Sequence, residues 1–294
     1  MSNRSKLGYE RLQKINPALI YCSITGYGQT GPYRNRAGHD NNYLSVAGVN
    51  GYSGREGERT PIMGTQIADI ACGSLRGVVG VLAAVNHRHV TGEGQHVDIS
   101  MTDAAFSLNV MSGADYLATG TEPAPGQNLL NGGSFYDYYE TSDGRYISVG
   151  SLEPQFFQRF CLALGGEELL RLGTKQDAIS EKAFKASLEE LFRLKSLADW
   201  QAIFFDKDAC VEPVLTFSEA CENEQIKARG MVVSVPISAD QTVDQIASPI
   251  RMSRCRPRYD YAGVALGEHN NQVLQELCVE KRLRDALQTS KAMG

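Results

Sequence analysis

Three side chains that can exchange protons, His39, Asp69 and Glu153, occupy turns or helix starts next to apolar segments of the sequence. His39 is followed by Asp40 in AGHDNNYLSVAG (residues 37–48), where polar residues run directly into residues that we expect to be buried. An imidazole at the edge of a core can act as a base near neutral pH. It can equally be a structural histidine bonded to a backbone carbonyl, and this segment alone leaves both interpretations open.

Asp69 begins the longest helix that the sequence predicts, which runs from about Asp69 to His87. A carboxylate at a helix N-terminus caps free backbone N–H groups. The same N–H groups can also stabilise negative charge on a substrate oxygen while the carboxyl group works beside it. The flanking sequence GTQIADIACG is small and apolar, so we expect Asp69 to be accessible to a substrate unless it is a plain helix cap.

Glu153 follows a predicted strand and precedes Pro154, which is typical of an acidic residue at a helix start. Its alternative role is to accept the ring N–H of a histidine and hold that histidine in one tautomer. We predict no metal site, because the seven cysteines form no CxxC pair. We interpret the cysteines as reduced core residues.

The elements that must position these residues are predicted from hydrophobic periodicity and turn residues. They are a buried strand at 18–28, a short helix at 40–46, the helix at 69–87, a strand in HVDISM, a helical stretch at 103–117, and a β-hairpin in SFYDYYETSDGRYISVGS. Gly73, Gly77 and Gly80 recur at helical spacing in the long helix. Because glycine weakens a helix, we expect another backbone to pack closely on that side.

The chain has 294 residues, of which 42% are hydrophobic and 21% charged, with a net charge of −5. These values are typical of a globular protein with a sizeable core. The excess of acidic residues argues against a nucleic-acid partner. The start of the chain has no apolar signal region, and no run of about 18 apolar residues is found, so we expect a cytoplasmic protein with no membrane span.

Seven segments spread over nearly the whole chain are together far more specific than any single motif. They are NPALIYCSITGYGQTGP, AGHDNNYLSVAGV, ADIACGSLRGVVGVLAAV, GEGQHVDISM, GQNLLNGGSFYDYYETSDGRYISVGSLEPQF, DACVEPVLTF and the late GEH. In this order the sequence resembles the family III CoA-transferase and racemase superfamily, most closely its α-methylacyl-CoA racemase branch. The histidine of GHD favours that branch over the transferases, which commonly lack it.

The resemblance implies an α/β fold, with a truncated Rossmann-like parallel-sheet large domain and a smaller α+β domain. It divides the chain into the remaining part of the large domain (1–118), a linker (119–133), the small domain (134–232), and a return linker with C-terminal helices that pack on the large domain (233–294). Family members carry a longer N-terminal part with the opening βα units and many contacts to the CoA nucleotide. Thr65 and Asn131 also depart from the racemases, which have Asn and Asp there.

The resemblance also implies the functional residues. The catalytic positions are His39, Asp40, Asp69 and Glu153, and the substrate-binding positions are Ile24, Gly26, Leu129 and Tyr136. No separate cofactor is implied, because CoA is carried by the substrate. The implied partners are an acyl-CoA thioester and a second copy of the chain, in a homodimer whose subunits can interlock and share active sites.

Inverting the α-carbon of a 2-methyl-branched acyl-CoA thioester needs two acid–base groups on opposite sides of that carbon. We assign these roles to His39 and Asp69, with Glu153 orienting His39 and amides at the start of the long helix stabilising the enolate. Two alternatives stay open. One is a CoA-transferase in which Asp69 is the nucleophile. The other is a truncated, weakly active or inactive family member with a binding role.

Overall fold

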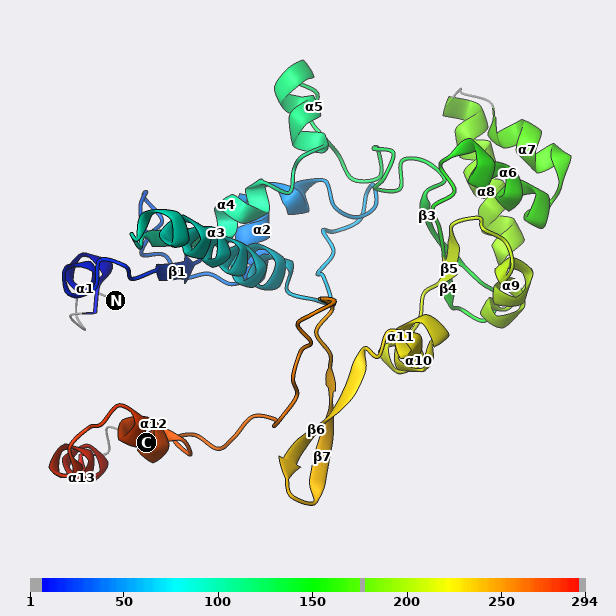
Figure 1. Ribbon diagram of the computed structural model, residues 1–294. Coiled ribbons are helices and arrows are strands. Elements are labelled where there is room, and N and C mark those ends of the chain that lie inside the picture. The colour runs from blue at the N-terminus through cyan, green and yellow to red at the C-terminus, as the bar shows by residue number, and fades with distance from the viewer. Residues whose placement is uncertain (1–6, 175–177, 291–294) are drawn as a thin grey trace. The chain divides into compact units, whose positions relative to one another are not determined.

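The computed structural model describes residues 7–174 and 178–290 and divides into two compact units, Met1–Val214 and Leu215–Gly294. Both parallel and antiparallel strand pairs occur, together with many helices (Figure 1). The predicted mixed α/β class is therefore confirmed. The four predicted domain ranges stay a prediction.

The first part of Met1–Val214 is built on a parallel strand pair. β1 (Tyr21–Thr25) pairs with β2 (His96–Ser100) in the register Tyr21↔His96 to Thr25↔Ser100. The helical elements are α1 (Tyr9–Ile15), α2 (Asp40–Val46), a 3-10 helix (Val49–Gly51), a π-helical segment (Ala68–Ser74), α3 (Leu75–Thr91), α4 (Met101–Phe106) and α5 (Ser112–Thr119). The predicted strands at 18–28 and in HVDISM are thus confirmed as neighbours.

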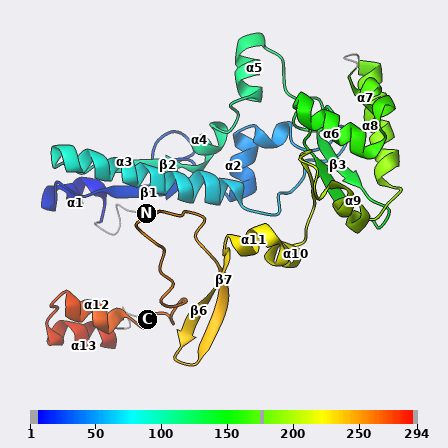
Figure 2. The same ribbon diagram turned by 45° about the vertical axis from the view of Figure 1, so that its right-hand side comes forward.

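The glycine face of the long helix packs on these strands. A Cβ added at Gly77 would lie 2.7 Å from Ile24 Cδ1, and one at Gly80 would lie 2.7 Å from Val97 Cγ1. Figures 1 and 2 both show α3 running along the strand pair. Close packing on this face is therefore confirmed, although the atoms that approach are β-branched side chains rather than another backbone.

A small hydrophobic core holds α2 and the π-helical segment together. Tyr43 and Leu44 of α2 are buried against Ala68 and Cys72, with Ala105 of α4 on the same cluster. Burying one side chain of this size contributes about 1.5–3 kcal/mol. This core fixes the start of the long helix next to the start of α2, which are the two segments that carry the predicted catalytic residues.

The continuous helix Ala68–Thr91 is long and apolar enough to cross a membrane, judged by length and composition only. The prediction that the sequence has no uninterrupted run of about 18 apolar residues is not contradicted, because this helix contains Asp69 and Arg76. The helix contacts β1 and β2, which is the packing of a core helix on a parallel strand pair. The finding is weak evidence for a membrane span.

The second part of Met1–Val214 contains an antiparallel sheet in the order β3-β4-β5. Its strands are β3 (Asp137–Glu140), β4 (Tyr146–Val149) and β5 (Val211–Pro213). The predicted hairpin at the Ser-Asp-Gly turn is confirmed as the β3–β4 pair. The helices are α6 (Pro154–Leu164), α7 (Glu167–Gly173), α8 (Ala178–Phe192) and α9 (Leu197–Phe204), and an aromatic core that includes Phe160, Phe192 and Trp200 joins them to the sheet.

The unit Leu215–Gly294 contains one antiparallel hairpin and four short helices among its described residues. β6 (Val232–Ser238) pairs with β7 (Gln241–Ile246), and the helices are α10 (Phe217–Glu222), α11 (Glu224–Ala228), α12 (Asn270–Glu276) and α13 (Lys281–Thr289). The chain after β7 is tied back to the hairpin, because the Ala262 N–H donates to the carbonyl of Pro236 in β6 at 2.7 Å.

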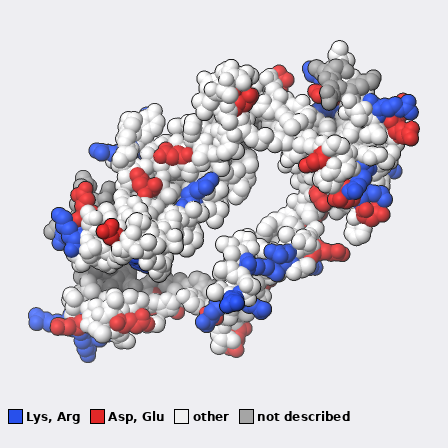
Figure 3. Space-filling view, turned by 45° about the horizontal axis from the view of Figure 1, so that its top comes forward, with Lys and Arg blue, Asp and Glu red and all other residues white. Residues whose placement is uncertain are grey.

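Figure 3 shows Lys and Arg side chains interspersed with Asp and Glu over the face in view. This surface differs from the continuous basic surface of a nucleic-acid-binding protein.

Candidate functional site

His39 stands at the N-terminus of α2, where the chain leaves the loop that follows β1. Its backbone N–H donates to the side-chain oxygen of Asn42 at 3.0 Å, and its carbonyl accepts from the Asn42 N–H at 2.8 Å. This reciprocal pattern resembles a capping box and fixes the backbone of residue 39. His39 is exposed, whereas we expected an imidazole at the edge of a core, and its catalytic role stays a prediction.

Asp40 is the buried member of the His-Asp pair, with 8% of its surface exposed. Its Oδ1 accepts a hydrogen bond of 3.0 Å from the backbone N–H of Asp69. Asp40 also lies near Cys72. Burial raises the pKa of the Cys72 thiol, and the negative charge of Asp40 adds to that rise, whereas the positive charge of Arg76 lowers the pKa. The carboxylate of Asp40 therefore fastens the start of α2 to the start of the long helix.

Asp69 is not the N-cap of the long helix, which corrects the prediction. It lies in the first turn of the π-helical segment, whose N-cap is Ile67, and the helix continues to Thr91 rather than ending near His87. Its carboxylate does not cap amides; instead, its own amide is satisfied by Asp40. Single π turns within α-helices occur frequently at functional sites.

The side chain of Asp69 is partly exposed and lies near Tyr43. Burial raises the pKa of the Tyr43 phenol, and the negative charges of Tyr27 and Asp69 add to that shift. The Tyr43 hydroxyl donates to the carbonyl of Gly38, the residue before His39. Tyr43 thus links the loop that carries His39 to the surroundings of Asp69.

Gly26 completes this neighbourhood from the end of β1. A Cβ at Gly26 would lie 2.4 Å from the Tyr43 ring, so only glycine allows the ring its position. The Gly26 carbonyl accepts from the Thr102 N–H at 3.0 Å and from the Thr102 hydroxyl at 2.8 Å. The structure therefore brings Gly26, Asp40 and Asp69 together around Tyr43. Ile24 of β1 packs against Gly77 of α3.

Glu153 is the N-cap residue of α6, and Pro154 occupies the first helical position, as predicted for a helix-start acid. Its carbonyl accepts from the Phe157 N–H at 2.9 Å, while its side chain is exposed. Glu153 also lies near Cys210, where burial and then the charges of Glu153, Asp208 and Glu212 raise the thiol pKa. Within the described part of this chain, no hydrogen bond joins Glu153 to His39.

Leu129 and Tyr136 line two cavities that share Leu130 and Asn131. Tyr136 lines a cavity of about 590 Å³, and Leu129 lines one of about 390 Å³. The side-chain amide of Asn131 donates hydrogen bonds to the carbonyls of Tyr52 and Ala124 at 3.0 and 2.9 Å. These two cavities can receive apolar groups of the size of an acyl chain.

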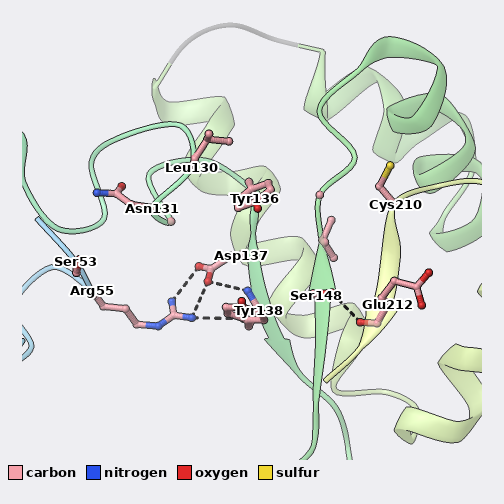
Figure 4. A pocket seen from close by; sticks show the side chains of 14 residues that line it. Ser53, Arg55, Leu130, Asn131, Tyr136, Asp137, Tyr138, Ser148, Cys210 and Glu212 are labelled. Carbon is pink, nitrogen blue, oxygen red and sulfur yellow. Dashed lines mark hydrogen bonds and ion pairs between the residues drawn. The ribbon is translucent and has the colours of Figure 1, made fainter. Parts of the chain in front are cut away.

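An ion cluster at the larger cavity was not predicted from the sequence. Arg55 donates two hydrogen bonds to Asp137, at 2.8 and 3.0 Å (Figure 4). Lys185 approaches the same carboxylate at 2.7 Å. The residues are 82 and 48 positions apart, so spacing gave no signal. The weak signal available was an acidic residue inside the aromatic run FYDYY, where a charge needs a partner.

Among the residues that the structure describes, no group of three or more His, Cys, Asp or Glu side chains is placed to hold a metal ion. All seven cysteines are free. Only Cys72 and Cys161 are fully buried, whereas Cys210, Cys255 and Cys278 are exposed, so the interpretation of all seven as core residues was wrong.

The family model that describes CoA-transferase family III matches residues 1–270 of this chain. The chain belongs to this family. A solved structure of a CAIB/BAIF family protein from Brucella suis superposes with a TM-score of 0.79 at 30% identity, covering 94% of this chain and 72% of that one. The predicted family III fold is therefore confirmed.

Characterised relatives within family III include both kinds of enzyme. Human alpha-methylacyl-CoA racemase is 35% identical over 274 residues, which cover 92% of this chain and 70% of that protein. Succinate–glutarate CoA-transferase from Agrobacterium fabrum is 31% identical over 281 residues, covering 92% of this chain and 68% of that protein. Racemases and CoA-transferases are thus both among the relatives of this chain.

Proposed function

We propose that this chain inverts the α-carbon of 2-methyl-branched acyl-CoA thioesters by two-base proton transfer. The supporting observation is the hydrogen bond from the Asp69 N–H to Asp40, which fastens the segment carrying His39 to the segment carrying Asp69. His39 and Asp69, which are thirty positions apart in the sequence, are therefore carried by two segments that are hydrogen-bonded to each other. Similarity to the human alpha-methylacyl-CoA racemase, at 35% identity, supports the choice of substrate.

In the proposed reaction, neutral His39 removes the α-hydrogen from one enantiomer, and protonated Asp69 delivers a proton to the opposite face. The two roles exchange for the other enantiomer, as inversion by two groups requires. The enolate oxygen needs hydrogen-bond donors, each typically worth about 3–4 kcal/mol of barrier. Because the Asp69 amide is already bonded to Asp40, that donor must be another group.

We propose that Glu153 reaches His39 from a second copy of the chain. Glu153 lies near Cys210 at the start of α6, without a hydrogen bond to His39 within the described part of one chain. A homodimer with shared active sites would bring the two together. Exposed apolar side chains on the long helix, including Leu75, Val79 and Leu82, support such an association, because monomers rarely expose large apolar surfaces.

The test is α-proton exchange in D2O. The chain is incubated with 2-methylhexanoyl-CoA, and deuterium incorporation is followed by mass spectrometry. His39→Ala and Asp69→Asn should each lower the exchange rate by about 100-fold or more, the usual contribution of a general acid or base. His89→Ala, in the exposed last turn of α3, is the matched control and should keep the rate. Native exchange in either site variant would refute the two-base proposal.

CoA transfer is the second candidate, supported by the similarity to succinate–glutarate CoA-transferase. Asp69 would then attack the thioester, expel CoA to form an acyl anhydride, and continue through an aspartyl-CoA thioester. Incubation with an acyl-CoA and a free carboxylic acid separates the candidates. Racemisation gives deuterium uptake without a new thioester, whereas transfer gives a new acyl-CoA. Absence of saturable acyl-CoA binding would instead favour a binding role for other ligands.

A further inference from the structure

The carboxylate of Asp137 is held between two cations at the wall of the larger cavity. Arg55 binds it with both terminal nitrogens, at 2.8 and 3.0 Å (Figure 4). Lys185 Nζ lies 2.7 Å from Oδ2, one of the two oxygens that Arg55 also binds. Only 8% of the Asp137 side chain is exposed, against 49% for Arg55 and 22% for Lys185. A bidentate pair of this kind is strong and directional.

Asp137 directly follows Tyr136, a predicted substrate-binding residue, and both line the cavity of about 590 Å³. Leu130, Tyr138 and Val149 also line it and give it an apolar character. Arg55 enters from the loop after the 3-10 helix, so one wall carries a guanidinium group.

A free guanidinium fork in an apolar cavity would bind a carboxylate at the far end of an acyl chain. Here Asp137 already fills that fork, and its own negative charge would repel a second carboxylate. Glu212 adds another acidic residue to the lining. The charged residues that line this cavity are thus Arg55, Asp137 and Glu212, with Lys185 on Asp137 outside the lining, and the two carboxylates disfavour a further carboxylate.

We propose that Asp137 is a specificity-determining residue that neutralises Arg55 and so restricts this cavity to uncharged acyl groups, excluding acyl chains that end in a carboxylate. This inference rests on the proposed function, because it assumes that the cavity beside Tyr136 receives the acyl chain. A purely structural ion pair would give a different result, since its loss would weaken both classes of ligand equally.

The experiment measures binding rather than turnover. Isothermal titration calorimetry gives the affinities of the chain for 2-methylhexanoyl-CoA and for glutaryl-CoA. The wild-type chain should bind 2-methylhexanoyl-CoA about tenfold more tightly or better. In Asp137→Asn, which keeps the shape of the side chain, glutaryl-CoA should gain about tenfold, and 2-methylhexanoyl-CoA should change by less than about threefold.

Two further variants locate the effect. Asp208→Asn makes the same chemical change at an exposed ion pair. Asp208 Oδ2 lies 2.6 Å from Arg159 Nη1, and the Asp208 side chain is 78% exposed, so this variant should change neither affinity. Adding Arg55→Gln to Asp137→Asn should reduce the gain for glutaryl-CoA, because the guanidinium that lines the cavity is then gone and only Lys185, which is 22% exposed, is left without the Asp137 carboxylate. If the Asp137 variant does not fold, the wild-type preference alone still tests the proposal.

The outcomes separate this inference from the proposed function. Equal wild-type affinities, or an unchanged preference in a folded Asp137→Asn, would overturn the inference even if the chain exchanges α-protons. A shifted preference in a chain that does not exchange α-protons would support the inference and count against the two-base reaction. Binding of neither thioester by the wild-type chain would overturn the inference, because the cavity then receives no acyl group.

Discussion

The side chain of Asp40 accepts a hydrogen bond from the backbone N–H of Asp69 at 3.0 Å, across 29 positions of sequence. The bond joins the start of α2 to the first turn of the long helix, beside the core formed by Tyr43, Leu44 and Cys72. A carboxylate here satisfies one of the free amides at the helix start and is favoured by the positive end of the helix dipole. Asp40 therefore positions Asp69.

Replacing Asp40 should destabilise the chain and loosen this attachment. In Asp40→Ala the Asp69 amide loses its acceptor, and we expect a loss of about 1.5–3 kcal/mol in the free energy of unfolding, the usual value for a hydrogen bond to a charged group. Asp40→Asn keeps an oxygen acceptor, so it should lose less. Urea denaturation followed by circular dichroism measures both.

Asp98 provides the matched control for Asp40. Its Oδ2 also accepts a backbone N–H, that of Gln29 at 3.0 Å, but Asp98 is exposed. Water can replace the lost acceptor there, so Asp98→Ala should cost less than about 1 kcal/mol. Equal losses for the Asp40 and Asp98 variants would show that burial of the Asp40 bond contributes nothing.

Local patterns in the sequence predicted much of the fold. The long helix with its glycine face, the strand pair from residues 18–28 and HVDISM, and the hairpin at Ser142-Asp143-Gly144 are all present. Each rests on periodicity or turn chemistry within one short segment, which a single sequence contains. The family resemblance supplied the rest of the architecture.

Features that depend on contacts between distant segments were not predicted. Asp69 was expected to cap its helix, but it lies in the first turn, where its own amide donates to Asp40. The pairing of Arg55 with Asp137 and the exposure of Cys255 and Cys278 were missed for the same reason. Tertiary partners, which no local pattern encodes, decide all of these.

Gly92 and Gly94 in the turn before β2 should respond differently to alanine. Gly92 has φ +79° with open space around it, so Gly92→Ala should cost about 1–2 kcal/mol, the penalty of a left-handed residue. At Gly94 a Cβ would lie 2.0 Å from the carbonyl oxygen of Leu19. A backbone atom cannot swing aside, so Gly94→Ala should cost about 3 kcal/mol or more. Thermal denaturation compares the two, and an equal or smaller loss at Gly94 would contradict this packing.

Cysteine labelling should separate buried from exposed thiols. Burial raises the pKa of Cys161 to about 12, so almost none of it is thiolate at pH 8, and the side chain is also shielded by its core. Iodoacetamide should therefore modify Cys255 and Cys278 in the native chain and leave Cys161 unmodified. Peptide mass spectrometry reads out each site, and labelling in urea is the control that should make Cys161 reactive. Rapid native labelling of Cys161 would show that its core opens.

Asp143 should make the free energy of unfolding depend on pH in the acid range. Its carboxylate accepts a hydrogen bond from the Thr141 hydroxyl at 2.5 Å and from the Leu197 N–H at 3.2 Å, and these bonds, that from Thr141 foremost, hold its pKa below the usual 3.8. A carboxyl group whose pKa is lower in the folded chain stabilises the fold above pH 3.8, and that stabilisation is lost as the pH falls through the folded value. Asp143→Asn should therefore flatten the fall in unfolding free energy below pH 4, measured by urea denaturation at several pH values. If the variant and the wild-type chain lose stability in parallel over this range, the hydrogen bonds of Asp143 do not favour its charged form.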